Sequence, residues 1–360
     1  MSKADISLNG TPLILYGELY TTYSEVTYTV HRTTDQMVNL EHYSRIGDVI
    51  IPTSGESPED IATATCVMVA GVILAGDLNI FRTTKVDGRI ISYIIKHKIN
   101  RKISRLAQGK SVVHISATEL AKINILFPSK SEQRKILEFL KLLDDKIAKQ
   151  TQLISILKKY KRGLNHKLLS EIDGQNYQEL GTVCSIVGGG TPDTLHPEYW
   201  EGSVEWFTPS EIGKNKYVLS SLRKISQIGL SNSPAKLLPA GTVLLTTRAT
   251  LGEMSIARTE CSTNQGFQSL IANKKRVLPE YLYYLQILIK PWCEKYASGN
   301  TFREISKVAL SKCIIPVPDL NEQAKIVNLL SRADNLISAQ EQVGDALTQA
   351  KEGLLQQLFI

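Results

Sequence analysis

The chain has 360 residues, a formal net charge of +7 and 42% hydrophobic residues. This length suits about two domains, each large enough to bury a core. No apolar run reaches the roughly 18 residues of a membrane-spanning helix, the N-terminus MSKADISLNG is too polar for a signal peptide, and five scattered cysteines form no Cys-x-x-Cys pair. We therefore expect a cytoplasmic protein without membrane contact, disulfide framework or zinc site.

Residues 1–130 are predicted to form a β-rich domain. Short β-branched and aromatic runs, bounded by Gly, Pro, Asn and Ser, are typical of a curled sheet. A helix is predicted over Ile90–Leu106. The predicted strands are Pro12–Tyr16, Val26–Val30, Asp48–Pro52 and Cys66–Leu74.

A polar loop, Gly109-Lys110-Ser111, follows the predicted helix. It contains the end of a P-loop pattern, but that pattern requires a glycine where Ser104 stands and a preceding strand. Two interpretations remain: a loop that presents polar groups to DNA, or a plain turn from helix to strand.

Residues 131–170 are predicted to form one long helix. Its apolar positions alternate steps of four and three, which is the heptad stripe of a helix that pairs with another helix. Ser131 is the expected N-cap, with Glu132 at the positive end of the helix. The predicted seam, polar at two positions, is Ile136, Leu140, Leu143, Ile147, Gln150, Ile154, Leu157, Lys161, Leu164 and Leu168.

The second half of the chain repeats this layout. Adding 190 aligns Gly109–Ser170 with Gly299–Ile360 without a gap, and 21 of the 62 aligned positions are identical. We therefore expect a second domain over 171–320 and a second helix over 321–360, capped by Asn321. The predicted strands are Val183–Val187, Val204–Phe207 and Thr242–Thr247, with a helical stretch over Pro279–Tyr296. The second seam is Ile326, Leu330, Ala333, Ile337, Gln340, Gly344, Leu347, Lys351, Leu354 and Leu358.

Charge favours pairing between the two predicted helices. Residues 131–170 hold ten basic and four acidic residues, whereas 321–360 hold three and five. This difference favours pairing of the first helix with the second over self-pairing. Two unrelated amphipathic helices are the alternative, which the matching polar seam positions disfavour. The basic run is either a solvated face or a surface near nucleic acid.

The two copies differ at their beginnings. The second has 25 residues, Tyr177–Glu201, before its Gly-Ser-Val-Glu-Trp-Phe strand, whereas the first starts almost directly at the counterpart, Gly10–Tyr16. We expect the first domain to be shortened at its N-terminus or to be built differently.

The sequence resembles the specificity (S) subunit of type I restriction–modification systems, over nearly its whole length. In the first domain, Leu15–Tyr20 is similar to a recurring segment of family target-recognition domains. The remaining signatures are Pro-x-x-x-Glu-Gln-x-Lys-Ile at Pro128–Ile136 and Pro318–Ile326, Gly-x-x-x-x-x-Ile-Ser at Gly109–Ser116 and Gly299–Ser306, Gly188–Pro192, and Asn264–Phe267.

The resemblance implies an α+β fold in which two repeated target-recognition domains are separated by two long helices, an antiparallel coiled coil with pseudo-twofold symmetry. It implies a DNA-binding specificity subunit that reads a bipartite, asymmetric site on double-stranded DNA and docks two modification and two restriction subunits. It implies no cofactor and no catalytic residue, because DNA methylation and ATP-dependent cleavage belong to those partners. The alternatives are a shortened, inactive relative, a scaffold that uses only its coiled coil, and a single-chain enzyme. The enzyme is disfavoured because no Pro-Pro occurs for an amino-methyltransferase motif and the histidines show no metal-binding spacing.

The candidate DNA-contact residues are polar, basic or aromatic side chains in predicted loops. Arg pairs with guanine, Asn and Gln pair with adenine, and Lys and Arg also bind phosphate. Each is weighed against an ordinary solvated loop residue. The candidates are Tyr16, Tyr20, Thr53, Ser54, Lys110, Ser111 and His114 in the first domain, and Ser210, Lys214, Thr247, Arg248, Asn264, Gln265, Asn300, Thr301 and Arg303 in the second.

Overall fold

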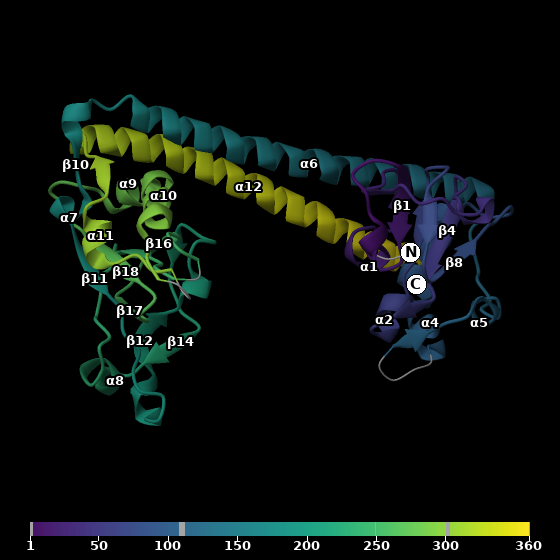
Figure 1. Cartoon of the computed structure of the whole chain (residues 1–360), viewed down its shortest axis with the longest axis horizontal. Helices are drawn as coiled ribbons and strands as arrows, with labels where there is room; N and C mark the ends of the chain where they lie inside the picture. The colour runs from purple at the N-terminus through teal and green to yellow at the C-terminus, as the bar shows by residue number, and fades with distance from the viewer. Residues whose placement is uncertain (1–2, 108–111, 249, 300–302, 360) are drawn as a thin grey trace. The chain divides into compact units, whose positions relative to one another are not determined.

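The computed structural model describes residues 3–107, 112–248, 250–299 and 303–359. The chain divides into two compact units, residues 1–152 with 341–360 (unit 1) and residues 153–340 (unit 2). Two long helices, α6 (Lys130–Ser170) and α12 (Leu320–Phe359), each contribute to both units (Figure 1). The predicted mixed class and both long helices are therefore confirmed.

Unit 1 contains two main sheets. Within the described residues, a three-stranded sheet has the order β3-β1-β7 and a four-stranded sheet the order β2-β6-β4-β8. A short pair, β5-β9, lies beside them. The strands are β1 (Thr11–Leu15), β2 (Val26–Thr27), β3 (Arg32–Thr34), β4 (Asp48–Pro52), β5 (Ser54–Gly55), β6 (Thr65–Val67), β7 (Ile73–Ala75), β8 (Leu78–Phe81) and β9 (Val113–His114). The α-helices before α6 are α1 (Glu18–Thr21), α2 (Pro58–Ile61), α3 (Gly88–Ile94), α4 (Asn100–Leu106) and α5 (Ala117–Leu120), with a π-helical turn at Ile95–Ile99.

Unit 2 repeats this plan with additional strands. Its sheets, within the described residues, have the orders β14-β12-β17, β11-β18-β15-β16-β13 and β10-β19. The strands are β10 (Tyr177–Glu179), β11 (Cys184–Gly188), β12 (Trp200–Phe207), β13 (Tyr217–Val218), β14 (Arg223–Ile225), β15 (Val243–Leu245), β16 (Met254–Ala257), β17 (Cys261–Thr263), β18 (Gln268–Ala272) and β19 (Ile314–Pro316). The α-helices before α12 are α7 (Leu180–Val183), α8 (Gln227–Ser231), α9 (Pro279–Tyr284), α10 (Gln286–Tyr296) and α11 (Lys307–Ser311).

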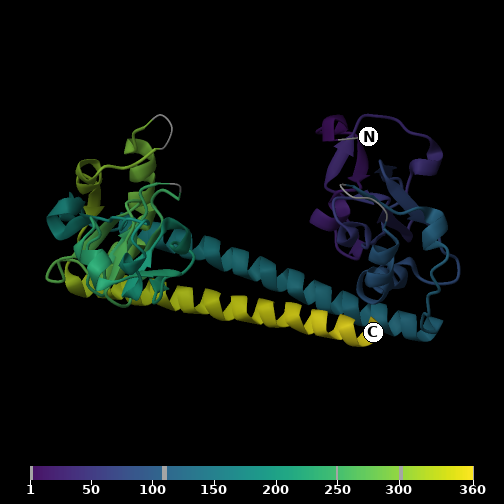
Figure 2. The same cartoon turned by 90° about the horizontal axis from the view of Figure 1, so that it is seen from below.

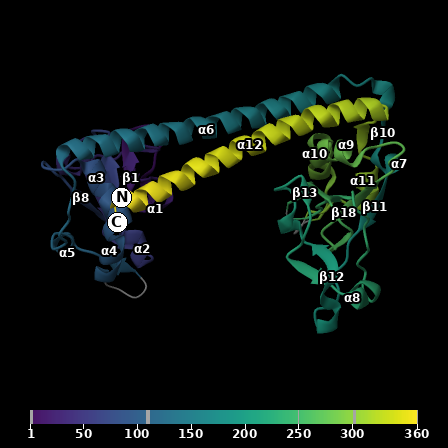
Figure 3. The same cartoon turned by 180° about the vertical axis from the view of Figure 1, so that it is seen from behind.

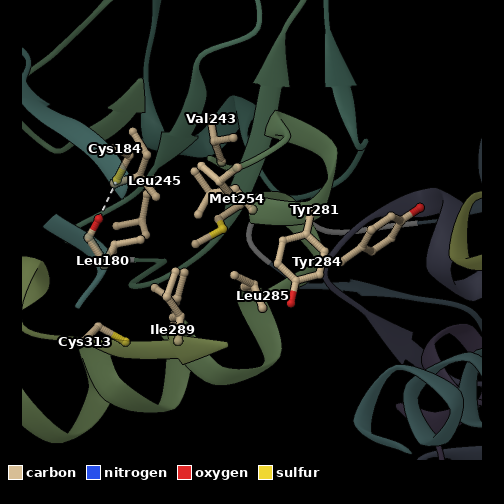
Figure 4. Packing of buried hydrophobic residues seen from close by; sticks show 14 of the residues in the cluster. Leu180, Cys184, Val243, Leu245, Met254, Tyr281, Tyr284, Leu285, Ile289 and Cys313 are labelled. Carbon is tan, nitrogen blue, oxygen red and sulfur yellow. Dashed lines mark hydrogen bonds between the residues drawn. The ribbon is translucent and has the colours of Figure 1, made fainter. Parts of the chain in front are cut away.

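The core of unit 2 joins its five-stranded sheet to α9, α10 and α12. Figure 4 shows Val243, Leu245 and Met254 of the sheet facing Leu285 and Ile289. Ile326 and Leu330 belong to the same cluster, so the first turns of α12 are part of the domain core. Leu137 and Leu140 of α6 enter the core of unit 1 in the same way, together with Leu355 and Phe359 of α12.

Two predicted elements differ in the structure. The run Cys66–Leu74 is split into β6 and β7, which belong to different sheets. Gly71, with a φ of +76°, forms the turn that separates them, a conformation that costs glycine little. The predicted helix 279–296 is likewise divided at Leu285 into α9 and α10.

The long helices begin earlier than predicted. Ser129, not Ser131, caps α6, because its hydroxyl and its backbone N–H both donate to the Glu132 carboxylate, at 2.7 and 2.8 Å. Asp319, not Asn321, caps α12, because its Oδ1 accepts from the backbone N–H groups of residues 321 and 322, both at 2.9 Å. The two caps are themselves 190 residues apart, so the repeat extends to the start of each helix.

A buried glutamine attaches each domain to its long helix. The Gln133 amide donates to the Pro128 carbonyl at 2.8 Å and accepts from the Asp87 N–H at 3.0 Å, just before α3. The Gln323 amide, 190 residues later, donates to the Pro318 carbonyl at 2.8 Å and accepts from the Leu278 N–H at 2.9 Å, just before α9. These contacts explain why glutamine stands at the same place in both copies of the Pro-x-x-x-Glu-Gln signature.

Within each unit, α6 and α12 lie side by side and run in opposite directions (Figures 1 and 2). In unit 1, Lys351 pairs with Asp144 at 2.7 Å. In unit 2, Lys161 pairs with Asp334. Each ion pair maps onto the other when 190 is added or subtracted, as a pseudo-twofold relation requires. The antiparallel pairing is confirmed within each unit.

Burial follows the predicted seam except at its last position. Every other seam residue is buried or half-buried. Leu358 is 40% exposed, whereas Leu355 and Phe359 are each 3% exposed. The stripe shifts there because the last turn of α12 packs on the domain core rather than on α6, as the stacking of Phe359 on Tyr93 shows.

Candidate nucleic-acid interface

Three candidates in unit 1 lie close together, two on paired strands and Thr53 between β4 and β5. Ser54 of β5 is the register partner of His114 in β9. The Thr53 carbonyl accepts a hydrogen bond from the N–H of Ile115 at 3.0 Å. Residues 60 positions apart in sequence therefore form one small surface, which continues toward α2.

Two tyrosines extend this surface. Burial raises the pKa of the Tyr20 hydroxyl, and Tyr16, Asp60 and Glu56 raise it further by their charge. Tyr20 folds back over the residue that follows Tyr16, since a Cβ on Gly17 would lie 3.4 Å from the Tyr20 hydroxyl oxygen. Because aromatic rings stack on bases and carboxylates accept from the cytosine amino group, the surface suits base contacts better than phosphate contacts.

The side chain of Ser54 is not available for this contact. It is 5% exposed, and its Oγ donates to Asp77 Oδ2 at 3.0 Å. A hydroxyl held in this way stabilises the strand junction, so the candidates of unit 1 that remain accessible in the described residues are the tyrosines, Thr53 and His114.

The candidates of unit 2 also come together. The Thr247 N–H donates to the Gly266 carbonyl at 2.7 Å, which joins the end of β15 to the Asn-Gln-Gly-Phe motif. Asn264 Oδ1 accepts from the Gly266 N–H at 2.9 Å and thereby shapes that turn. A Cβ added to Gly266 would lie 2.9 Å from Pro209, beside Ser210. Ser210, Arg248, Asn264 and Gln265 therefore border one surface.

Sequence reasoning missed Glu304, which organises this surface. Arg248 donates to the Glu304 carboxylate from Nε at 2.9 Å and from Nη2 at 2.8 Å. This two-point contact fixes the guanidinium plane while leaving Arg248 part-exposed. Thr247 is fully buried and its hydroxyl also reaches Glu304, at 3.4 Å, so it supports Arg248 rather than contacting a ligand. A lone acidic residue beside Arg303 gives no sequence signal for this role.

The glycine run in unit 2 packs directly against the Asn-Gln-Gly-Phe motif. A Cβ on Gly189 would lie 2.1 Å from the Asn264 carbonyl oxygen, so only glycine fits there. The hydroxyl of Thr191 donates to Gln265 Oε1. The two motifs thus form one rigid edge at the end of β11 and β17.

The remaining candidates separate into two groups. Arg303 donates to the Glu294 carbonyl at 2.5 Å, which ties its loop to α10, and Lys214 is exposed on the turn at Gly213. Lys110, Ser111, Asn300 and Thr301 lie outside the described residues.

Strand register shows that the two surfaces occupy equivalent places. Val49 pairs with Cys66 and with Phe81, as Val243 pairs with Ile256 and with Leu270. Thr53 and Ser54 therefore follow β4 where Thr247 and Arg248 follow β15. The same sheet edge carries the candidate residues in both copies, with different side chains.

The described residues contain no group of three or more His, Cys, Asp or Glu side chains arranged to hold a metal ion. Residues 3–107, 112–248, 250–299 and 303–359 also include no helix that is both long and apolar enough to cross a membrane. All five cysteines are buried, and this burial raises the pKa of each thiol to about 12.

Both copies match one family model, "Type I restriction modification DNA specificity domain", over residues 49–159 and 172–349. The chain is 33% identical to the MjaIX specificity subunit of Methanocaldococcus jannaschii over 198 residues, which are 54% of this chain and 45% of that protein. It is 27% identical to the EcoR124I/EcoR124II specificity subunit of Escherichia coli over 267 residues, which are 70% of this chain and 66% of that protein. These alignments therefore span about half and about two thirds of the relatives.

Two solved structures share the fold. A chain from a structure on assembly and conformational transition of the type I R-M system superposes with a TM-score of 0.64 at 19% identity, covering 97% of this chain and 91% of that one. The S subunit of a type I restriction–modification system from M. genitalium gives a TM-score of 0.54 at 17% identity, covering 100% and 91%.

Proposed function

Because this chain belongs to the type I restriction modification DNA specificity family, we propose that it selects the DNA sequence on which a restriction–modification complex acts. The observation that supports this most directly is the equivalence of the two candidate surfaces. Both lie where β4 or β15 ends, yet the first carries Thr53 and His114, and the second carries Arg248, held by Glu304, and the turn that Asn264 shapes. Different side chains on one framework suit two different half-sites.

The target is a two-part, asymmetric site on double-stranded DNA. Arg248 suits guanine, and Asn264 and Gln265 suit adenine, through paired hydrogen bonds in the major groove. Tyr16 and Tyr20 suit stacking or methyl contacts in the other half-site. Lys214 and Arg303 suit phosphate, which positions the second domain without reading sequence. The long helices set the distance between the two half-sites.

The partners are two modification and two restriction subunits. Methyl transfer and cleavage belong to them, so this chain is non-catalytic. Alone it binds DNA weakly, because the long basic stretch of residues 131–170 lies on a helix rather than in the recognition loops.

Methylome sequencing after co-expression with the modification subunit tests the proposal. The expected result is one methylated motif with two unlike parts and a fixed spacer, and Arg248→Ala should relax the motif in one half only. A symmetric motif, or unchanged half-sites in the Arg248→Ala strain, would contradict it.

One observation favours a second candidate, a shortened and inactive relative. The main sheet of unit 1 has four strands within the described residues, where that of unit 2 has five. If unit 1 cannot read DNA, the methylome will show no motif, or only the half-site read by unit 2.

A further inference from the structure

The edge strands β2 and β13 occupy equivalent places in the main sheets of the two units. β2 pairs in parallel with β6, and β13 pairs in parallel with β16, at residues that the register of β4 and β15 makes equivalent. The residue immediately before β2 is Glu25, and the residue immediately before β13 is Lys216. One place in the fold therefore carries opposite charges in the two copies.

In unit 1, Glu25 reaches the ion pair between α6 and α12. Its Oε2 lies 3.9 Å from Lys351 Nζ, which itself lies 2.7 Å from the Asp144 carboxylate. Its Oε1 faces Lys96 and His97, from the π-helical turn of the same domain, at 3.2 and 2.9 Å. The first domain therefore meets the helices through an anion next to their lysine.

In unit 2, Lys216 lies against the equivalent ion pair, Lys161 with Asp334. Its Nζ donates to the Ser331 hydroxyl of α12 at 3.0 Å and to the Tyr284 hydroxyl at 2.8 Å. The Tyr284 hydroxyl donates in turn to Asp334 at 2.6 Å. The second domain therefore meets the helices through a cation next to their aspartate. A serine hydroxyl at such a place can also donate to a carboxylate.

The charged groups around Lys216 are of both signs. Burial lowers the pKa of Lys216, Asp334 and Glu280 raise it, and Lys161 and Arg258 lower it. A carboxylate in this place would instead be attracted by Lys161 and Arg258 and repelled by the two acidic residues. Because two groups of each sign surround the position, its surroundings do not require a positive charge.

We propose that the lysine–aspartate pair of α6 and α12 is a docking point that accepts a domain through a charge of either sign. An acidic residue before the edge strand pairs with the lysine, as Glu25 does, and a basic residue turns to the aspartate, as Lys216 does. The sign of the charge on a domain therefore does not decide whether these helices can carry it. The proposal rests on the contacts within each unit and not on DNA recognition, so it stands apart from the proposed function.

Charge reversal at Lys216 in the full-length chain tests the docking point. In the native chain, Lys216 still neutralises Asp334 when Lys161 is replaced by methionine. In the Lys216→Glu chain, Lys161→Met instead leaves two carboxylates facing each other. We expect Lys161→Met to raise the equilibrium constant for unfolding of unit 2 by about tenfold more in the Lys216→Glu chain than in the native chain. Urea denaturation followed by tryptophan fluorescence, on the four chains of this cycle, measures the difference.

Lys159→Met is the matched control, because Lys159 is an exposed lysine of the same helix. It should change the unfolding constant alike in both backgrounds. An equal effect of Lys161→Met in the two backgrounds would overturn the proposal, since the new carboxylate would then make no use of the lysine. A Lys216→Glu chain in which unit 2 fails to fold would overturn it as well, since the docking point would then accept only a cation.

Discussion

Gln133 and Gln323 show how one side chain can connect a domain to a helix. Each is at most 5% exposed. Each side-chain amide accepts a hydrogen bond from the backbone N–H just before α3 or α9, and donates one to the carbonyl of the proline that precedes α6 or α12. Gln323 donates additionally to the Arg276 carbonyl at 2.8 Å. A buried amide satisfied on both sides is costly to remove, because its buried backbone partners lose these hydrogen bonds.

Replacement of Gln323 by alanine should therefore destabilise unit 2 by about 1–3 kcal/mol, the cost of leaving buried polar groups unpaired. Urea denaturation followed by the fluorescence of the three tryptophans, which all lie in unit 2, measures this. Gln342→Ala, exposed on the same helix, is the matched control and should have little effect. Equal effects of the two substitutions would remove the proposed role of Gln323.

Glu25 is a buried carboxylate that lies beside a histidine and two lysines. It lies 2.9 Å from His97 Nε2, 3.2 Å from Lys96 Nζ and 3.9 Å from Lys351 Nζ. Burial alone would raise the pKa of Glu25, but the His97 hydrogen bond and the two lysines outweigh it and hold the pKa well below its usual range. Ionised Glu25 therefore stabilises unit 1.

The sign of this pKa shift gives a pH prediction. A carboxylate with a depressed folded-state pKa contributes stability above its unfolded value of about 4.3 and loses that contribution as the pH falls further. Glu25→Gln should cost roughly 1–3 kcal/mol at pH 7, and its difference from the native chain should shrink below about pH 4.3. Urea midpoints across pH 3–7 measure it. The exposed Glu59→Gln is the control, and a difference constant with pH would contradict the prediction.

At the residue scale, the sequence predicted which candidate loops come together better than which of their side chains stay exposed. The candidates in each domain converge because they follow adjacent strands, which periodicity reveals. Burial of Ser54 and Thr247, and the pairing of Arg248 with Glu304, depend on contacts between segments some 60 residues apart. Such contacts are set by tertiary packing and leave no local pattern.

At the element scale, the two long helices carry the repeat most clearly. Their caps, glutamines and seam ion pairs recur at the same interval, so each end of the pair is built alike. Figure 3 shows α3 next to the first turns of α6, which is where Gln133 connects them. Periodicity predicted these helices because the spacing of apolar residues along a helix is a local pattern. The strand 66–74 was predicted without its turn, because composition does not reveal the backbone angle of Gly71.

A double-mutant cycle can measure the seam ion pair of unit 1. Asp144 and Lys351 should be coupled by about 0.5–1 kcal/mol, since Lys351 is well shielded while Asp144 is part-exposed. Lys141 and Asp145, an exposed pair within one turn of α6, provide the control and should be coupled by about 0.3–0.5 kcal/mol. Chemical denaturation of the four variants of each cycle gives both values, and zero coupling for Asp144 with Lys351 would exclude a contribution to register.

At the scale of the whole molecule, each long helix belongs to both units, and unit 1 is built from two separate stretches of chain. Unit 1 is completed by residues 341–360, from the far end of the sequence. The chain length and the internal repeat predicted two domains and two long helices. They did not predict that the last turn of α12 would enter the core of the first domain, because that packing depends on tertiary contacts of the paired helices.

Insertion of one heptad after Gln150 and another after Gln340 tests the helices as a spacer. Each insertion adds seven residues, or about 10.5 Å of helix, which corresponds to roughly three base pairs at 3.4 Å each. Methylome sequencing should show a spacer longer by that amount and unchanged half-sites. An insertion in one helix alone shifts the seam against its partner and should abolish methylation. Altered half-sites would disprove the spacer role.

The glutamine joints have a consequence for how such a chain can change. Within the described residues, the side-chain hydrogen bonds of Gln133 and Gln323 all go to main-chain atoms. Hydrogen bonds of this kind do not depend on which side chains the bonded residues of the domain carry. A domain of altered or foreign sequence can therefore be mounted on the same helix, provided that its backbone presents an N–H and a carbonyl at the same two points.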